Sequence, residues 1–184
     1  MTCKNTVFLR DIIFEHLPEL FPTKSSRQLA LKTPKAFNVE HLVEIALERA
    51  STGSYEFVDR DGYDFTDFSD SKTATISSSE QRCTVNSLEN KIGAIRLCVY
   101  NGYRDKVDYF FFDTDAVSRL GEPSYGKHAY KVRMRSGYNV YADTYSKFEP
   151  YRVATFSELA TRMEDGAKID TAPKTFSTFF AVSS

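Results

Sequence analysis

The residues best suited to chemistry in this sequence are the acidic and lysine side chains between Tyr63 and Ile76. Asp70 and Lys72 are two positions apart at the start of a run that reads as a β-strand, so both are expected on one face of that strand. Asp64 lies close upstream, within reach of Asp70 if the chain bends between them. Two carboxylates can hold Mg²⁺ or Mn²⁺, and a neighbouring ammonium can steady charge that builds on a phosphate. The segment therefore predicts metal-dependent phosphodiester hydrolysis.

The same segment has a simpler interpretation as a solvated turn. Asp61-Gly62 is a common hairpin turn, and Asp-rich stretches that contain Gly are usually exposed. A carboxylate two positions before a lysine also arises by chance in many proteins. The surrounding sequence must therefore decide between a catalytic segment and a polar loop.

Charge is distributed unevenly along the chain, although its total is uninformative. The 184 residues carry 24 basic and 25 acidic side chains, a net charge of -1. Six acidic residues and one Arg lie between Glu56 and Asp70, whereas six basic residues and two acidic ones lie between Lys127 and Arg152. Acidic side chains can collect a cation and basic side chains can collect phosphates, so this distribution favours a metal-dependent nuclease.

The basic segment contains the candidate nucleic-acid contacts. Lys131, Arg133 and Arg135 alternate along the sequence and would share one face of a strand. Cations at that spacing can follow a phosphate backbone, and the neighbouring tyrosines could stack on bases. An equally good interpretation is a solvated edge strand, where Lys and Arg discourage aggregation.

Cysteine content and hydropathy indicate an intracellular protein with no membrane segment. Cys3, Cys83 and Cys98 are odd in number and have neither paired nor zinc-binding spacing, so a disulfide framework is not expected. Cys98 lies in an apolar run and is expected to be a core thiol. No apolar stretch reaches membrane-spanning length, and the N-terminus lacks a secretory pattern. The cytoplasm, a reducing compartment, is the expected location.

The apolar pattern predicts an α+β fold with a central, mostly antiparallel or mixed sheet flanked by helices. The chain length is typical of a single domain, so one domain is expected over residues 1–184. Asn38 and Thr114 are expected to cap helices, and residues 25–37 read as a connector. Helices are expected over 7–17, 38–50, 114–120 and 157–164, and strands over 55–60, 63–68, 72–77, 82–88, 93–100, 106–113 and within 125–145.

This order of elements resembles that of the PD-(D/E)XK nucleases, the restriction-endonuclease-like superfamily. A helix with an acidic residue precedes a hairpin with an Asp, and a strand with carboxylate-x-Lys follows. The stretch from Asp64 to Thr73 is similar to the mismatch-repair nicking endonuclease branch, with its Asp-Phe opening and its carboxylate-x-Lys-Thr close. The resemblance covers about residues 38–112 and implies a nuclease-like core over residues 38–120, with 121–184 as a basic and aromatic C-terminal part.

The resemblance also implies roles for individual residues. Asp64 would match the first metal ligand, Asp70 the second carboxylate and Lys72 the catalytic lysine. Glu44, in Leu42-Val43-Glu44-Ile45-Ala46-Leu47, would match the acidic residue of the first helix, although an exposed helix carboxylate is an equal alternative. The first ligand stays open, because Asp59, Asp61 and Asp67 are alternatives to Asp64.

Two further side chains, Lys91 and His41, have ordinary interpretations. Lys91 could approach the site from the loop before the strand at 93–100, but a solvated loop lysine is the favoured interpretation. His41 beside Glu40 reads as a surface helix pair.

Taken together, the sequence predicts a metal-dependent endonuclease that hydrolyses DNA, of the restriction or phage type and sequence-specific. One such site cleaves one strand, so cutting both strands would require a homodimer or two binding events. The rival is a non-catalytic interaction or inhibitor protein, phage- or host-encoded, whose acidic stretch engages a basic, nucleic-acid-handling partner. A third alternative is the same chemistry on RNA.

Overall fold

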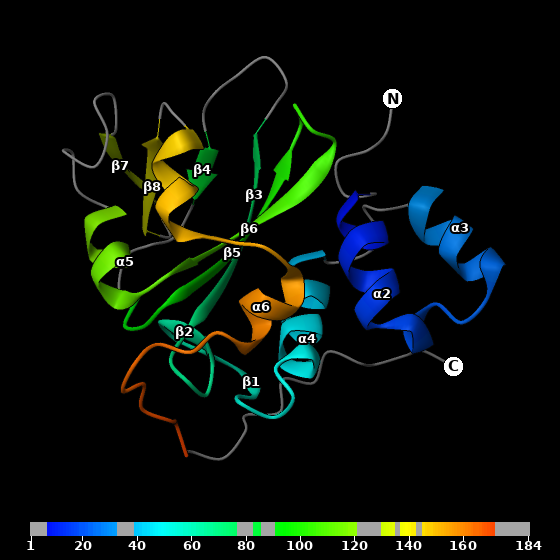
Figure 1. Ribbon diagram of the computed structural model, residues 1–184, viewed down its shortest axis with the longest axis horizontal. Helices are drawn as coiled ribbons and strands as arrows, with labels where there is room; N and C mark the ends of the chain where they lie inside the picture. Colours follow the sequence, from blue (N-terminus) through cyan, green and yellow to red (C-terminus); the bar gives the residue numbers. More distant parts are fainter. Residues whose placement is uncertain are drawn as a thin grey trace.

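A mixed four-stranded sheet forms the centre of the protein in the computed structural model (Figure 1). The structure describes residues 7–32, 39–76, 83–85, 91–120, 130–134, 137–142 and 145–171. The strand order is β3-β5-β6-β9, in which β3 and β5 are parallel and the other neighbours are antiparallel. These strands are β3 (Asp70–Ile76), β5 (Ile95–Asn101), β6 (Lys106–Phe112) and β9 (Arg152–Val153).

Two smaller sheets accompany the central one. The first is the antiparallel hairpin predicted around Asp61-Gly62, and the second joins β4 to β8 and β7. The fold is therefore α+β with a mixed central sheet, as predicted. The strands are β1 (Phe57–Arg60), β2 (Tyr63–Phe65), β4 (Cys83–Val85), β7 (Tyr130–Met134) and β8 (Gly137–Ala142).

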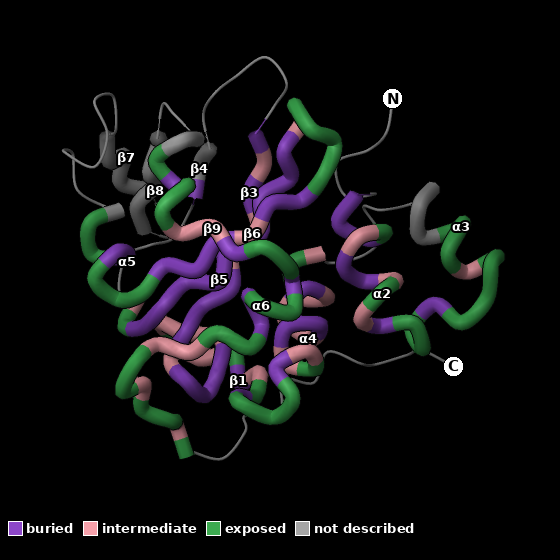
Figure 2. The backbone as a smooth tube through the Cα atoms, in the orientation of Figure 1, coloured by how far each residue is buried: buried purple, intermediate pink, exposed green. Residues whose placement is uncertain are grey.

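Both faces of the central sheet are buried (Figure 2). Alternation along β5 places Ile95, Leu97 and Val99 on one face and Cys98 and Tyr100 on the other. The first face packs against α5 (Thr114–Leu120) and the 3₁₀ segment η5 (Tyr145–Tyr151). The second face packs against the N-terminal helices, α4 (Val39–Ala50) and α6 (Phe156–Thr161). Cys98 is a buried free thiol, as predicted.

The N-terminal helical segment was predicted correctly, but the element after it was not. Residues 24–32 form a helix, α3 (Lys24–Lys32), in place of the expected connector. Thr23 explains the difference, because its hydroxyl accepts a hydrogen bond from the Ser26 backbone N–H and so caps the helix. Pro22 and Pro34 flank this helix and do not interrupt it. The preceding elements are the π-helix η1 (Leu9–Ile13), α2 (Phe14–His16) and the 3₁₀ turn η2 (Pro18–Leu20).

The predicted helix caps had different outcomes. Asp113, not Thr114, caps α5, because the Asp113 carboxylate accepts a 2.7 Å hydrogen bond from the Ala116 N–H. The Thr114 hydroxyl instead donates to Glu164. Asn38 lies outside the described residues. In the part of the chain that the structure describes, no helix is both long and apolar enough to cross a membrane.

Candidate active site

Asp70 and Lys72 lie at the beginning of β3, the first strand in the order of the central sheet. The Lys72 ammonium is 2.9 Å from Asp70 Oδ2, which confirms that the two side chains share one face. Ala74 and Ile76 continue that face into the apolar core. The polar pair therefore lies where the apolar part of the strand ends, and only 1% of the Asp70 side chain and 13% of the Lys72 side chain are exposed.

Asp64 is brought back to the start of β3 by a tight turn after β2. The Asp64 N–H donates a 2.9 Å hydrogen bond to the Ser69 carbonyl, and Asp64 Oδ2 accepts a 2.7 Å hydrogen bond from the Ser71 N–H. Phe68, with φ of 63°, turns the chain within this segment, so the second strand of the hairpin ends at Phe65 and not at Phe68 as predicted. The Asp64 carboxyl thus lies beside that of Asp70.

Lys91 completes the cluster, contrary to the expectation of a solvated loop lysine. Its ammonium is 2.6 Å from Asp70 Oδ2, and only 12% of its side chain is exposed. The backbone at Gly93, two residues after Lys91, lies against the Phe68 carbonyl of the turn. A Cβ at position 93 would be 2.3 Å from that carbonyl oxygen, so only glycine allows this close approach. The Asp70 N–H also donates to the Ala94 carbonyl at 2.9 Å.

The protonation states of these groups differ because their surroundings differ. Burial and the adjacent Asp70 carboxyl raise the pKa of Asp64 to about 9. Burial also disfavours ionised Asp70, but a hydrogen bond from Asp64 and the two ammonium groups outweigh this and lower the pKa of Asp70. For Lys72, attraction by Asp70 and Asp64 outweighs burial and raises the pKa. At neutral pH the cluster therefore holds a protonated Asp64, an ionised Asp70 and an ammonium on Lys72.

Glu44 lies on α4, which packs against β3. Its charge makes a minor contribution to the raised pKa of Asp64. Burial raises the pKa of Glu44 itself to about 7. The alternative prediction, that Glu44 is an exposed helix carboxylate, is wrong. Only 12% of its side chain is exposed, and its Oε2 lies 3.2 Å from His41 Nδ1. His41, expected to pair with Glu40 on the surface, is thus Glu44's partner and also contacts the Phe57 ring.

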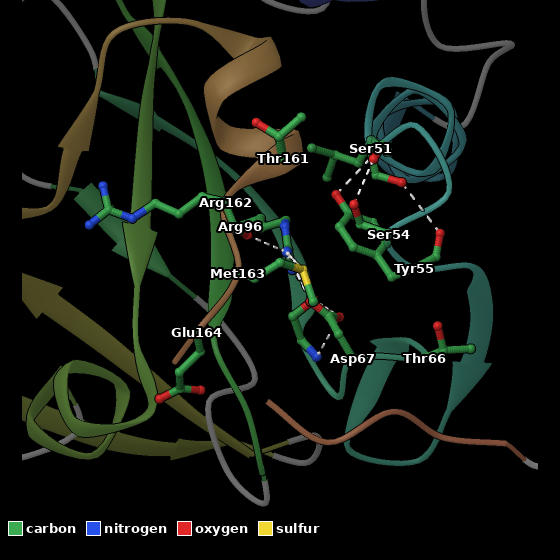
Figure 3. Close-up of polar contacts among 12 residues, drawn as sticks. Ser51, Ser54, Tyr55, Thr66, Asp67, Arg96, Thr161, Arg162, Met163 and Glu164 are labelled. Carbon is green, nitrogen blue, oxygen red and sulfur yellow. Dashed lines mark hydrogen bonds and ion pairs between the residues drawn. The ribbon is translucent and has the colours of Figure 1, made fainter. Parts of the chain in front are cut away.

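The structure distinguishes Asp64 from the alternative upstream aspartates. Asp59 and Asp61 are exposed on the β1–β2 hairpin. Asp67 is buried, but its carboxylate pairs with Arg96 at 2.9 Å and with Ser69 (Figure 3). Asp64 is therefore the upstream carboxylate that reaches Asp70.

Arg96 is a fully buried cation that the sequence analysis did not identify. Its guanidinium donates to Asp67 Oδ2 and Ser69 Oγ in the turn between Asp64 and Asp70. It also donates to the Leu159 and Arg162 carbonyls at the end of α6, and it lies 4.2 Å from the centre of the Tyr55 ring. This one side chain therefore joins β5, α6 and the turn that positions the two carboxylates (Figure 3).

The carboxylate pair could accept a divalent cation in place of a proton. Both Asp70 side-chain oxygens are buried, and their neighbours are the protonated Asp64 carboxyl and the ammonium groups of Lys72 and Lys91. A cation that displaced the Asp64 proton would meet two carboxylates. Within the described ranges, no group of three or more His, Cys, Asp or Glu side chains could hold a metal ion. A metal bound by Asp64 and Asp70 would therefore need further ligands from water or substrate, as is common for Mg²⁺ held by one or two carboxylates.

The predicted nucleic-acid residues lie elsewhere in the fold. Lys131 and Arg133 are in β7, whose backbone pairs with β8 as an antiparallel hairpin. The strands predicted within 125–145 are confirmed by β7 and β8, and contact with nucleic acid stays a prediction. Arg135 lies outside the described residues.

Replacing Asp64 by Asn tests the unusual protonation of this site. Because the native state holds the Asp64 proton up to about pH 9 and the unfolded chain loses it near 3.8, this group makes the protein less stable as pH rises between those values. One proton can contribute at most about 1.4 kcal/mol per pH unit. In EDTA, Asp64→Asn should melt several degrees above wild type at pH 8 and near it at pH 4, by circular dichroism. A variant that is less stable at every pH would contradict the assignment.

Comparison with known proteins adds no family to this description. No protein-family model matches the sequence, and no curated protein matches it.

Proposed function

We propose that this protein is a metal-dependent endonuclease that hydrolyses DNA phosphodiester bonds. The observation that carries the proposal is the meeting of Asp64, Asp70, Lys72 and Lys91 at the start of β3, from three separate parts of the chain. Such a mixture of buried carboxylates and ammonium groups is costly to fold, and perturbed side chains of this kind concentrate at functional sites. The arrangement also agrees with the resemblance to restriction-endonuclease-like nucleases.

The chain's own residues would divide the chemistry between them. Asp64 and Asp70 would hold Mg²⁺ or Mn²⁺, which supplies Lewis-acid polarisation of the phosphate and of the attacking water. Binding would displace the proton that Asp64 holds, because a ligating carboxylate must be ionised. Lys72, which stays an ammonium, would donate hydrogen bonds and stabilise negative charge on the scissile phosphate, and it would not act as a base.

Glu44 and Lys91 would support this centre. Burial raises the pKa of Glu44 to about 7, and its helix packs against β3, so it could take or release a proton near the site at neutral pH. Lys91 balances the charge of Asp70 and keeps its carboxylate ionised. Lys131, Arg133 and Arg135 are proposed to grip the phosphate backbone, and cutting both strands would need two such sites.

A plasmid-nicking assay with matched variants tests the proposed function. Wild-type protein with Mg²⁺ should convert supercoiled plasmid to open circles, and Asp70→Asn should lose about 10³-fold or more of that rate. Asp61→Asn is the control, because Asp61 is an exposed aspartate in the nearby hairpin turn. Substrates should include methylated and unmethylated DNA of varied sequence, and an RNA of matched sequence.

Mg²⁺ binding gives a second readout that does not require the right substrate. Millimolar Mg²⁺ should raise the melting temperature of wild type and of Asp61→Asn, but not of Asp70→Asn. Equal nicking by all three proteins would point to contamination. Neither nicking nor Mg²⁺-dependent stabilisation would overturn the proposal and favour the non-catalytic interaction protein.

A further inference from the structure

Helix α3 concentrates positive charge in an otherwise nearly neutral chain. From Leu20 to Val39 the sequence has four basic residues and no acidic one, although the whole chain carries 25 acidic residues. The helix stands at one side of the molecule beyond α2, away from the central sheet (Figure 1). Most of its described part is exposed (Figure 2). The four basic residues of the segment are Lys24, Arg27, Lys32 and Lys35.

The cations of α3 differ from those around the central sheet in whether they form ion pairs with carboxylates. In the central region, the cations Lys72, Lys91 and Arg96 each meet a carboxylate within 3 Å. By contrast, neither Lys24 nor Arg27 forms an ion pair with a carboxylate of the described residues. The positive potential of this helix is therefore not neutralised locally and is open to an anionic partner.

The local structure holds one of these cations in place. Arg27 Nε donates a 2.9 Å hydrogen bond to the Phe21 carbonyl, and the guanidinium lies 6.0 Å from the centre of the Phe14 ring. A guanidinium fixed through Nε keeps its terminal N–H groups for a second partner, and a planar fork suits a phosphate. The Thr23–Ser26 cap fixes the start of the helix, so Lys24 is held on a defined turn beside it.

We infer that α3 is a second phosphate-contacting element that binds the backbone of duplex DNA. The inference rests on the proposed function for its choice of DNA as the polyanion. Charge complementarity carries it: a helix with cations and no carboxylates fits a phosphate row, whereas an acidic or neutral protein surface would need more apolar area than the exposed Leu20 and Leu29 provide. The contact would be independent of base sequence.

The test compares two double variants with the same change in charge. Lys24→Gln/Arg27→Gln removes two of the three α3 cations. Arg119→Gln/Lys147→Gln removes two exposed cations from α5 and η5, which pack on the opposite face of the sheet. Binding of a fluorescent duplex of varied sequence is measured by anisotropy in EDTA, so that no cleavage occurs, at several salt concentrations.

We expect the α3 variant to bind about tenfold more weakly than wild type near 0.1 M salt. Its slope of log affinity against log salt should also fall in magnitude by about 1.8, or about 0.9 for each lost phosphate contact. The control variant should keep both values, and circular dichroism should show both variants folded. An α3 variant with wild-type affinity and slope would overturn the inference, as would a wild-type protein that binds no duplex.

The binding experiment separates this inference from the proposed function. Loss of affinity in the α3 variant, with neither nicking nor Mg²⁺-dependent stabilisation of wild type, would uphold the helix as a DNA contact and remove the catalytic proposal. Nicking by wild type with unchanged binding in the α3 variant would support the catalytic proposal and overturn the inference that α3 contacts DNA.

Discussion

Replacing Arg96 by Met should lower the free energy of unfolding by about 3–5 kcal/mol, which is a large part of the stability of a domain of this size. Met nearly fills the volume of the arginine but cannot donate hydrogen bonds. The change would leave the Asp67 carboxylate charged and buried without its partner, and would release the Leu159 and Arg162 carbonyls. An unpaired buried charge is among the most costly features that a single substitution can create.

A second substitution checks that the unpaired charge is the cause. Arg96→Met/Asp67→Asn should recover a substantial part of the loss, since the asparagine is neutral and can still accept from the Ser69 N–H. Urea denaturation followed by circular dichroism measures both variants. Arg10→Met is the control, because Arg10 pairs with Asp11 but half of its side chain is exposed, so it should lose less than about 1 kcal/mol. A loss below about 1 kcal/mol for Arg96→Met would show that the buried pair does not hold the turn in place.

Replacing Lys72 by Met should reduce Mg²⁺-dependent nicking by about 10³-fold while the protein stays folded. Lys72 is the ammonium that shares a strand face with Asp70 and lies 2.9 Å from its carboxylate. Its loss removes a hydrogen-bond donor and a positive charge where negative charge would build on the phosphate. Lys91→Met should cost less, because Lys91 reaches Asp70 from outside the strand and serves mainly to keep that carboxylate ionised.

Lys106 provides a matched control for these lysine variants. Its ammonium lies 3.4 Å from Asp108 on β6, but half of its side chain is exposed, so Lys106→Met should nick as wild type does. Initial rates on supercoiled plasmid are compared at equal folded protein, judged by melting curves. If Lys72→Met kept the wild-type rate, the assignment of a catalytic lysine would be wrong, whereas equal losses for Lys72 and Lys91 would show that the two ammonium groups act as one unit.

The sequence alone determined the local features of this protein. The Asp61-Gly62 turn, the strand predicted over 72–77 and observed over Asp70–Ile76, and the alternation of apolar residues in β5 follow from turn chemistry and a two-residue period, which depend on near neighbours only. For the same reason Asp70 and Lys72 could be placed on one strand face. Helix α3 lies where the sequence predicts a connector, because prolines and polar residues are typical of connectors and outweigh the local Thr23 cap in the pattern.

Only the tertiary structure decided which distant residues join the site. β3 and β5 are parallel and begin side by side, with Asp70 opposite Ile95, so the loop before β5 carries Lys91 to the carboxylate. Because β5, α6 and the turn pack together, Arg96 forms an ion pair with Asp67. Asp64, and not Asp67, is then the carboxylate that contacts Asp70. Such choices depend on strand register and on burial of charge across long separations in sequence, which no local pattern of residue types records.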